Sequence, residues 1–304
     1  MPRRSCALLL VLLAGCGGGG DGGGDERKTE WELGPPLAKR RSYVAAGEIG
    51  GRIYVAGGMV GNTGRRLDGV EVFDPDAQAW SALPRLPERV RAAAGATAGR
   101  RFFVLGGTTA AGGGRQVFVY DVDRSQWRRG PQLPRVLYNH SAVTLGGRVY
   151  TLGGYDTEGA ELRDVYVLER GRWRAAARLP RPVHAFGAVV FRGEIWIIGG
   201  RRGEEKLREV WIFDPKSRRW RAGPSLPKPM ELLGATVVGD EIHAVWERTY
   251  QIYDEREGRW RDGPAPLTPR HALSLFNVGG TLYAVGGCTP ALRDSAVVEK
   301  RVVS

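Results

Sequence analysis

The sequence predicts an all-β fold, a closed ring of six four-stranded blades, because three features repeat along it. Single tryptophans recur at intervals of 40 to 49 residues: Trp31, Trp80, Trp127, Trp173, Trp220 and Trp260. Most intervals also hold an apolar run that ends in a Gly-Gly pair, at Gly58, Gly107, Gly154, Gly200 and Gly287. A variable loop and a second apolar run, such as VEVFDP or VWIFDP, follow. A period of this length is typical of a β-propeller, in which each repeat forms one blade.

Each repeat is expected to contain four strands, named a to d from the inside of the ring outwards. Strand a is a small apolar stretch such as residues 92–98, strand b ends in the Gly-Gly pair, and strand d carries the tryptophan. Strands a and b are apolar at nearly every position, as expected where neighbouring blades cover both faces. Strand c alternates more, which is typical of a strand nearer the rim.

One repeat is degenerate. The 87 residues between Gly200 and Gly287 correspond to two repeats, so a unit without the glycine pair is expected between them. Residues 241–260 fit this unit, with Trp246 and Glu247 in place of the glycines and almost no loop after them. We therefore expect a gap in the rim at the fifth blade, through which a ligand can enter.

The two ends of the repeat region predict how the ring closes. Residues 29–33 read as a strand d, whereas the last repeat ends after a strand c candidate at residues 295–302. The amino-terminal strand is therefore predicted to complete the sixth blade, which removes an exposed sheet edge. The predicted propeller spans residues 29–304.

These residues resemble the kelch repeat, in which an apolar strand ending in Gly-Gly precedes a Tyr-Asp or Phe-Asp strand and a spaced tryptophan. The resemblance covers residues 29–304, with five intact repeats and one degenerate repeat. It implies a binding or scaffolding module, for which we expect no catalytic residue, no cofactor and no metal. Two kelch enzymes remain as alternatives: sialic acid mutarotase, which is exported and six-bladed, and, less favoured, galactose oxidase, which has seven blades and uses copper.

The first 28 residues predict export and membrane anchoring. Residues 1–15 have a basic start and a short apolar run, the pattern of a secretory signal peptide. Residues 13–16, Leu-Ala-Gly-Cys, resemble the bacterial lipobox, which implies lipidation of Cys16. Residues 16–28 then form a flexible glycine-rich tether. We expect a lipid-anchored, extracytoplasmic protein on the periplasmic or cell-surface side of a bacterial membrane, with Cys288 as its one remaining free thiol.

Positive charge is unevenly distributed over the predicted loops. The formal net charge is +12. The d-to-a segments carry eleven basic and three acidic residues, whereas the face opposite to them carries equal numbers of each sign. The d-to-a segments and b-to-c loops share one face of the ring, so we predict a basic channel mouth that attracts an anionic ligand. Arginine-rich loops that merely keep the protein soluble remain the alternative.

The expected partners are an anionic glycan, a wall polymer or an acidic protein segment, bound by a monomer. Export argues against nucleic acid. Three of the histidines, His140, His184 and His271, lie where a d-to-a segment enters strand a, 13, 15 and 15 residues before the first glycine of the pair, so they are expected on the same side of their strands. Polar and basic residues of the predicted face supply the candidate ligand-binding set: Arg41, Arg91, Tyr138, His184, Arg201, Arg202, Glu231, Arg270 and His271.

Overall fold

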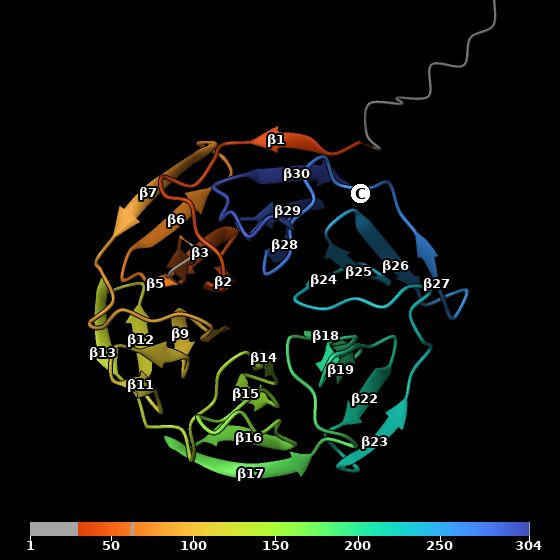
Figure 1. The fold of residues 1–304 in the computed structure, drawn as a ribbon, viewed down its shortest axis with the longest axis horizontal. Helices are drawn as coiled ribbons and strands as arrows, with labels where there is room; N and C mark the ends of the chain where they lie inside the picture. Colours follow the sequence, from red (N-terminus) through yellow and green to blue (C-terminus); the bar gives the residue numbers. More distant parts are fainter. Residues whose placement is uncertain (1–29, 62–63, 304) are drawn as a thin grey trace, which may run out of the picture.

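The chain forms a ring of six four-stranded antiparallel sheets around a central channel (Figure 1), which confirms the predicted six-bladed propeller. The computed structural model describes residues 30–61 and 64–303. The signal peptide, Cys16 and the tether lie outside these residues. Within the described ranges there is no helix long and apolar enough to cross a membrane.

Strands follow one another from the channel to the rim in each blade. Blade 1 contains β2 (Ala45–Ile49), β3 (Arg52–Ala56), β6 (Val70–Asp74) and β7 (Ala79–Leu83), and blade 2 contains β8 (Ala94–Ala98), β9 (Arg101–Leu105), β12 (Val117–Asp121) and β13 (Gln126–Arg129). Blade 3 contains β14 (Ser141–Leu145), β15 (Arg148–Leu152), β16 (Asp164–Glu169) and β17 (Arg172–Arg178), and blade 4 contains β18 (Gly187–Phe191), β19 (Glu194–Ile198), β22 (Val210–Asp214) and β23 (Arg219–Ala222). Blade 5 contains β24 (Gly234–Val238), β25 (Glu241–Trp246), β26 (Thr249–Asp254) and β27 (Arg259–Asp262), and blade 6 contains β28 (Ser274–Val278), β29 (Thr281–Val285), β30 (Val298–Val302) and β1 (Glu32–Gly34).

Three b-to-c loops end in small hairpins that stand on the same face. These are β4 (Met59–Val60) with β5 (Arg65–Arg66), β10 (Thr108–Thr109) with β11 (Gly112–Gly113), and β20 (Arg201–Arg202) with β21 (Glu205–Lys206). Blade 5 has no such loop, because β25 pairs with β26 up to Trp246 and Thr249. The predicted loss of the b-to-c loop in blade 5 is therefore confirmed.

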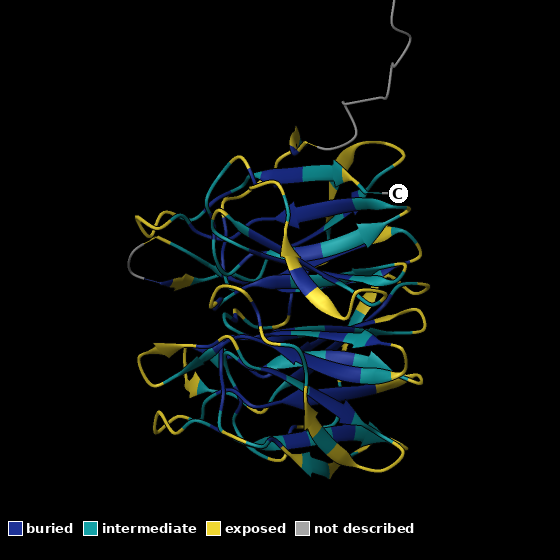
Figure 2. Ribbon diagram, turned by 90° about the vertical axis from the view of Figure 1, so that its right-hand side faces the viewer, coloured by how far each residue is buried: buried dark blue, intermediate teal, exposed yellow. Residues whose placement is uncertain are grey.

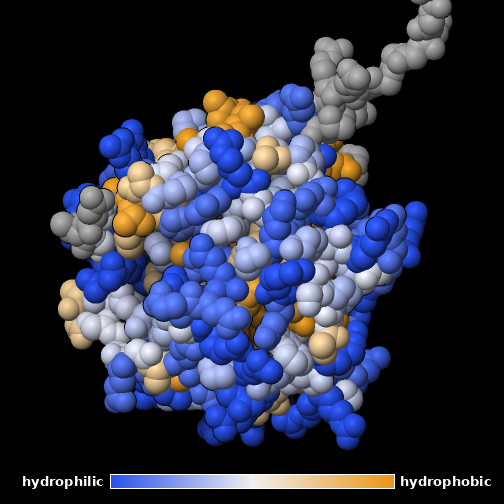
Figure 3. Space-filling model, turned by 45° about the vertical axis from the view of Figure 1, so that its right-hand side comes forward, coloured by the Kyte–Doolittle hydropathy of each residue, from blue (hydrophilic) through white to orange (hydrophobic). Residues whose placement is uncertain are grey.

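The second strand of each blade is the most buried. In β3, β9, β15, β19 and β29 the last four residues are all buried, which accounts for the unbroken apolar runs in the sequence. Burial decreases toward the fourth strand and the loops (Figure 2). The surface turned to the viewer in Figure 3 is mostly hydrophilic, with scattered apolar patches. Leu33 and Leu292 are among the exposed large apolar side chains.

The Gly-Gly pairs connect neighbouring blades. The amide of the second residue of each pair donates to a carbonyl in the segment that enters the next blade, for example Gly107 to Leu137 at 2.8 Å. We call these the junction bonds, and they occur at all six blade junctions, including Gly287 to Arg41 at 3.1 Å. At Gly107 the φ angle is 86°, and a Cβ atom there would lie 2.6 Å from the Arg91 carbonyl oxygen. Glycine is therefore required at this position.

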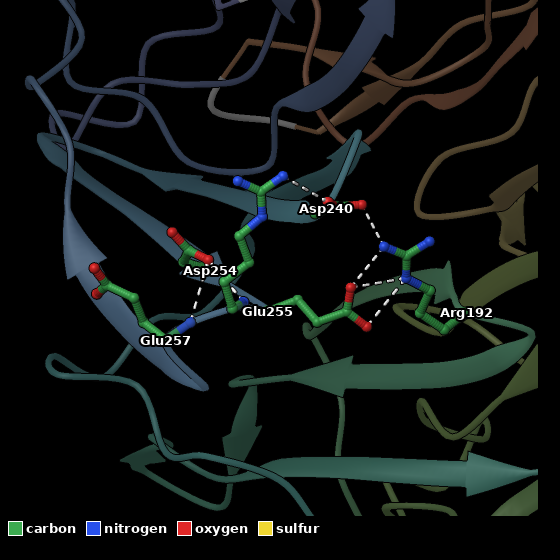
Figure 4. A network of polar contacts seen from close by, with 6 residues as sticks. Arg192, Asp240, Asp254, Glu255 and Glu257 are labelled. Carbon is green, nitrogen blue, oxygen red and sulfur yellow. Dashed lines mark hydrogen bonds and ion pairs between the residues drawn. The ribbon is translucent and has the colours of Figure 1, made fainter.

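In blade 5, Glu247 takes the place of the second glycine of the Gly-Gly pair, as predicted. Its φ angle is 51°, and its amide donates to the Arg270 carbonyl at 2.8 Å, which is the junction bond of this blade. On the opposite face, Arg192 of blade 4 binds Glu255 of blade 5 through its Nε at 2.9 Å and also contacts Asp240 (Figure 4). This network joins blades 4 and 5 on the face opposite to the b-to-c loops.

The recurrent tryptophans also join blades. Five of the six indole N–H groups donate to a proline carbonyl in the segment that follows the preceding blade, as Trp127 does to Pro84 at 2.7 Å. In the sixth blade Trp31 donates to Pro264 at 2.9 Å and is 4% exposed. Its neighbouring strand β1 pairs with β30, from Glu32 with Lys300 to Gly34 with Val298. The predicted closure by the amino-terminal strand is confirmed.

Because β1 contains only three residues, we expect Trp31 to provide most of the free energy with which the amino-terminal segment stabilises the closed ring. We predict that Trp31→Ala lowers the free energy of unfolding by about 3–5 kcal/mol, since it removes a buried indole. The matched change Leu33→Ala, at an exposed position of the same strand, should alter it by less than about 0.5 kcal/mol. Urea unfolding followed by circular dichroism measures both, and equal effects would contradict this role of Trp31.

Candidate functional site

The channel mouth is built on six residues in the left-handed region of the backbone. One such residue lies two positions before strand a of each blade, with φ between 46° and 55°: Tyr43, Ala92, Asn139, Ala185, Leu232 and Ala272. Five of their amides donate to the carbonyl of the counterpart in the preceding blade, at 2.6 to 3.1 Å. Residues with side chains seldom adopt this conformation, and they persist where surrounding bonds fix them. The result is a girdle of backbone around the mouth.

The residue before each girdle position forms what we call the mouth ring. It consists of Ser42, Arg91, Tyr138, His184, Glu231 and His271. Five of its members form a β-bridge with the residue that follows the Gly-Gly pair of the same blade, as His271 does with Cys288. The ring contains five of the nine predicted site residues. Ser42 was missed, although its distance from the Gly-Gly pair is the signal that finds it.

The prediction that Arg41 and Arg270 bind the ligand is corrected, because both side chains are buried and neither can contact a ligand in this structure. They are 1% and 0% exposed, at equivalent positions one residue before the mouth ring. Arg41 pairs with Glu71, and Arg270 lies 3.4 Å from Glu299, which is also fully buried. The remaining four entry segments carry Val90, Leu137, Val183 and Met230 at this position. Both arginines are therefore part of the core between blades.

Other arginines of the basic face hold the segments that connect blades. Arg115, Arg163 and Arg208 occupy equivalent positions, and the Nε of each donates at 2.6 Å to a leucine carbonyl in its own d-to-a segment. Arg135 pairs with Asp156 at 2.7 Å and Asp164 at 3.0 Å. Much of the positive charge counted from the sequence thus has a structural role, which the charge count alone does not reveal.

Arg91 differs from these arginines. It forms no ion pair with any carboxylate in the described part of the chain; its Nε lies 3.3 Å from Thr108 Oγ1, and its Nη1 lies 3.4 Å from the Gly64 carbonyl. It lines a cavity of about 250 Å³ together with Tyr43, Tyr138 and Asn139. Burial raises the pKa of Tyr43 to about 12, so its hydroxyl stays protonated at neutral pH. This cavity combines an unpaired cation with neutral hydrogen-bonding groups.

The half of the mouth formed by blades 3 to 5 carries charges of both signs. His184 Nδ1 lies 3.2 Å from Glu161 Oε1, and its Nε2 lies 2.9 Å from the Tyr155 hydroxyl. Burial lowers the pKa of His184, which is then neutral at pH 7. Glu231 is buried beside Arg201 at 3.2 Å and Lys206 at 3.5 Å.

Arg202 lies apart from this arrangement, paired with Glu205 at 2.7 Å and Glu209 at 3.6 Å.

His271 completes the arc on blade 6. Its Nε2 lies 2.9 Å from Cys288 Sγ, and its Nδ1 lies 3.6 Å from Glu247 Oε1.

His140 does not lie in the mouth ring with His184 and His271. It is buried with both ring nitrogens unpartnered, and burial lowers its pKa to about 3. Residues 30–61 and 64–303 contain no group of three or more His, Cys, Asp or Glu arranged to hold a metal ion.

The chain belongs to the kelch-repeat propeller family, since the model of the KLHDC2/KLHL20/DRC7 Kelch-repeats domain matches residues 42–245. It is similar to F-box protein AFR of Arabidopsis thaliana, 35% identical over 57 residues, which are 19% of this chain and 15% of that protein. It is also similar to Kelch-like protein 21 of Rattus norvegicus, 39% identical over 61 residues, which are 20% of this chain and 10% of that protein. The match thus spans less than a fifth of either relative.

A solved structure described as "Structure of YjhT" has the same fold. The two superpose with a TM-score of 0.77 at 13% sequence identity, over 87% of this chain and 95% of that chain. This likeness supports the propeller architecture alone.

The contribution of the buried pair Arg270–Glu299 to stability can be tested by substitution. We predict that Arg270→Met, which introduces the residue found at the equivalent Met230, lowers the free energy of unfolding by about 3–5 kcal/mol because Glu299 stays buried without its partner. Adding Glu299→Gln should restore part of this loss by removing the orphaned charge. Chemical unfolding of both variants measures it. A loss below about 1 kcal/mol for Arg270→Met would show that the pair is not required.

Proposed function

We propose that this propeller is an extracytoplasmic interaction module that binds an anionic ligand at its channel mouth, with Arg91 as the main contact. The observation that carries the proposal is an arginine without a carboxylate partner among the described residues, on the wall of a cavity beside the mouth. A carboxylate or phosphate in this cavity would form charge-assisted hydrogen bonds with the guanidinium group, which are stronger than neutral ones. Tyr138 and Asn139 would add polar contacts.

Several exposed cations surround this cavity on the same face. Lys39, Arg40 and Arg65 are exposed in the loops around blade 1. They have the position to steer an anionic ligand toward the mouth without contacting it directly. An acidic glycan, a wall polymer or an acidic protein segment meets these requirements, and the protein would act as a monomer.

The proposed location rests on residues 1–28, whose pattern is that of a lipidated export signal followed by a glycine-rich tether. In that setting the propeller would reach ligands near the membrane surface. The proposal of an anionic ligand does not depend on the anchor, because it rests on the mouth alone.

A carbohydrate-active enzyme similar to sialic acid mutarotase is the second candidate. One observation favours it: His184, Glu231 and His271 occupy successive positions of the mouth ring, beside Arg201. Imidazoles held neutral by burial next to a carboxylate are suited to moving a proton on a bound sugar. The galactose oxidase-like alternative gains no observation from the arrangement of the described residues.

Arg91→Ala tests the binding site. On an array of acidic glycans and acidic peptides, we expect the best-binding member to lose about 10- to 100-fold in affinity, the worth of a hydrogen bond to a charged group. Arg91→Lys should retain part of the affinity. Arg101→Ala is the matched control, because Arg101 is exposed at the start of β9 on the other face. Equal affinity of Arg91→Ala and Arg101→Ala would contradict the assignment.

A further inference from the structure

Three side chains from blades 5 and 6 form a connected set at the edge of the mouth. Cys288 follows the Gly-Gly pair of blade 6, and His271 lies opposite it as its β-bridge partner. The thiol sulfur is 2.9 Å from His271 Nε2, and Glu247 Oε1 is 3.6 Å from His271 Nδ1. A nucleophile, a base within hydrogen-bond reach and a third group that orients the base are the parts of an activated nucleophile.

The contacts favour one of the two neutral tautomers of the His271 ring. A neutral imidazole has one donor nitrogen and one acceptor nitrogen. A carboxylate only accepts hydrogen bonds, so the Glu247 side chain beside Nδ1 favours the tautomer in which Nδ1 bears the hydrogen. Nε2 is then the acceptor, and the Cys288 thiol donates to it. His271 is therefore oriented to remove the proton from the sulfur.

The protonation states agree with a reaction that starts from the thiol. Burial lowers the pKa of His271, while Glu247 and Glu231 act in the opposite direction, so the ring is neutral at pH 7. Burial raises the pKa of the Cys288 thiol to about 11, and Asp294 contributes to this rise. The resting pair is thus a neutral thiol and a neutral imidazole. Attack would require transfer of the proton to His271 as the new bond forms.

The missing loop of blade 5 leaves the base and the carboxylate open to solvent. The side chains of Glu247 and His271 are 31% and 12% exposed, whereas Cys288 is 3% exposed. Because the sulfur is nearly covered, we expect only small reagents to reach it. In blades 1, 2 and 4 a hairpin stands at the corresponding position.

We propose that Cys288 is a nucleophile that accepts an acyl group from small activated esters, with His271 as general base and Glu247 as a positioning residue. The sulfur forms a bond to the carbonyl carbon while its proton moves to Nε2 of His271. The bond between the carbonyl carbon and the alcohol oxygen then breaks, and the alcohol leaves with the proton from Nε2. The product is a thioester on Cys288, and no redox change occurs.

p-Nitrophenyl acetate is a suitable probe for the full-length protein, because the released p-nitrophenolate and the acetylated peptide are measured separately. We expect one acetyl group on the peptide that contains Cys288, and none on that peptide in Cys288→Ala. His271→Gln should lower the acylation rate about 100-fold, the worth of a general base. Glu247→Gln should lower it less, while the control Glu257→Gln, at an exposed position of the opposite face, should leave it unchanged.

The pH profile separates this mechanism from a thiol that is merely buried. The charged groups around the pair are Glu247, Glu231, Lys206 and Asp294. Native acylation should stay nearly constant between about pH 7 and 8, because burial lowers the pKa of His271 and the ring is neutral there, whereas the urea-unfolded chain should slow about tenfold per pH unit below its thiol pKa. Glu247→Gln should change both the height of the native pH profile and its position on the pH axis. Native acylation slower than that of the unfolded chain at about pH 7, or an undiminished rate in His271→Gln, would overturn the proposal.

Discussion

The junction bonds are the constraint on which the mouth of this propeller depends. Each one connects strand b of a blade to the entry segment of the next blade, so it fixes where that segment crosses the rim of the channel. The residue that accepts the bond is followed by a mouth ring residue and then by a left-handed girdle residue. Because the same three positions follow one another at every junction, six side chains of five kinds are presented in one ring.

This arrangement separates the scaffold from the variable chemistry. The Gly-Gly pairs and tryptophans repeat because each makes the same contact between blades, through an amide in one case and an indole N–H in the other. The side chains of the mouth ring residues make no such common contact, although five of the backbones share a β-bridge, so most of these side chains differ from blade to blade. One half of the mouth offers an arginine and two aromatic hydroxyls, and the other half offers imidazoles, a carboxylate and a thiol.

The blades and the closure of the ring were predictable from the sequence, because each depends on a pattern within a short stretch of chain. The tryptophan period and the apolar strands define the blades, and the strand d pattern near Trp31 defines the closure. Arg41 and Arg270 were wrongly assigned to the ligand site because a surface arginine and a buried one look alike in a loop. The signal lay elsewhere: Glu71 and Glu299 occupy a position of strand c at which other blades carry Phe118, Tyr166 or Trp211. A carboxylate at such a buried position requires a cation.

The side-chain contacts between neighbouring blades could not be predicted from the sequence. Glu247 and His271 are separated by 24 residues, and nothing in their spacing indicates that their side chains meet. The pairing depends on the loss of the blade 5 loop, which brings Glu247 to the edge of the mouth. Charge counts likewise identify the basic face, but only hydrogen bonds show that Arg115, Arg163 and Arg208 are committed to the scaffold, whereas Arg91 is not.

Hydrogen exchange of the junction amides in the full-length protein tests the central claim most directly. The amides of Gly58, Gly107, Gly154, Gly200, Glu247 and Gly287 should exchange as slowly as those of the inner strands β9 and β15, since they open only when the ring opens. Gly287 is decisive, because its bond to Arg41 crosses the closing junction. Exchange of Gly287 or Glu247 at the rate of exposed turn amides would show that the ring is not held together in this way.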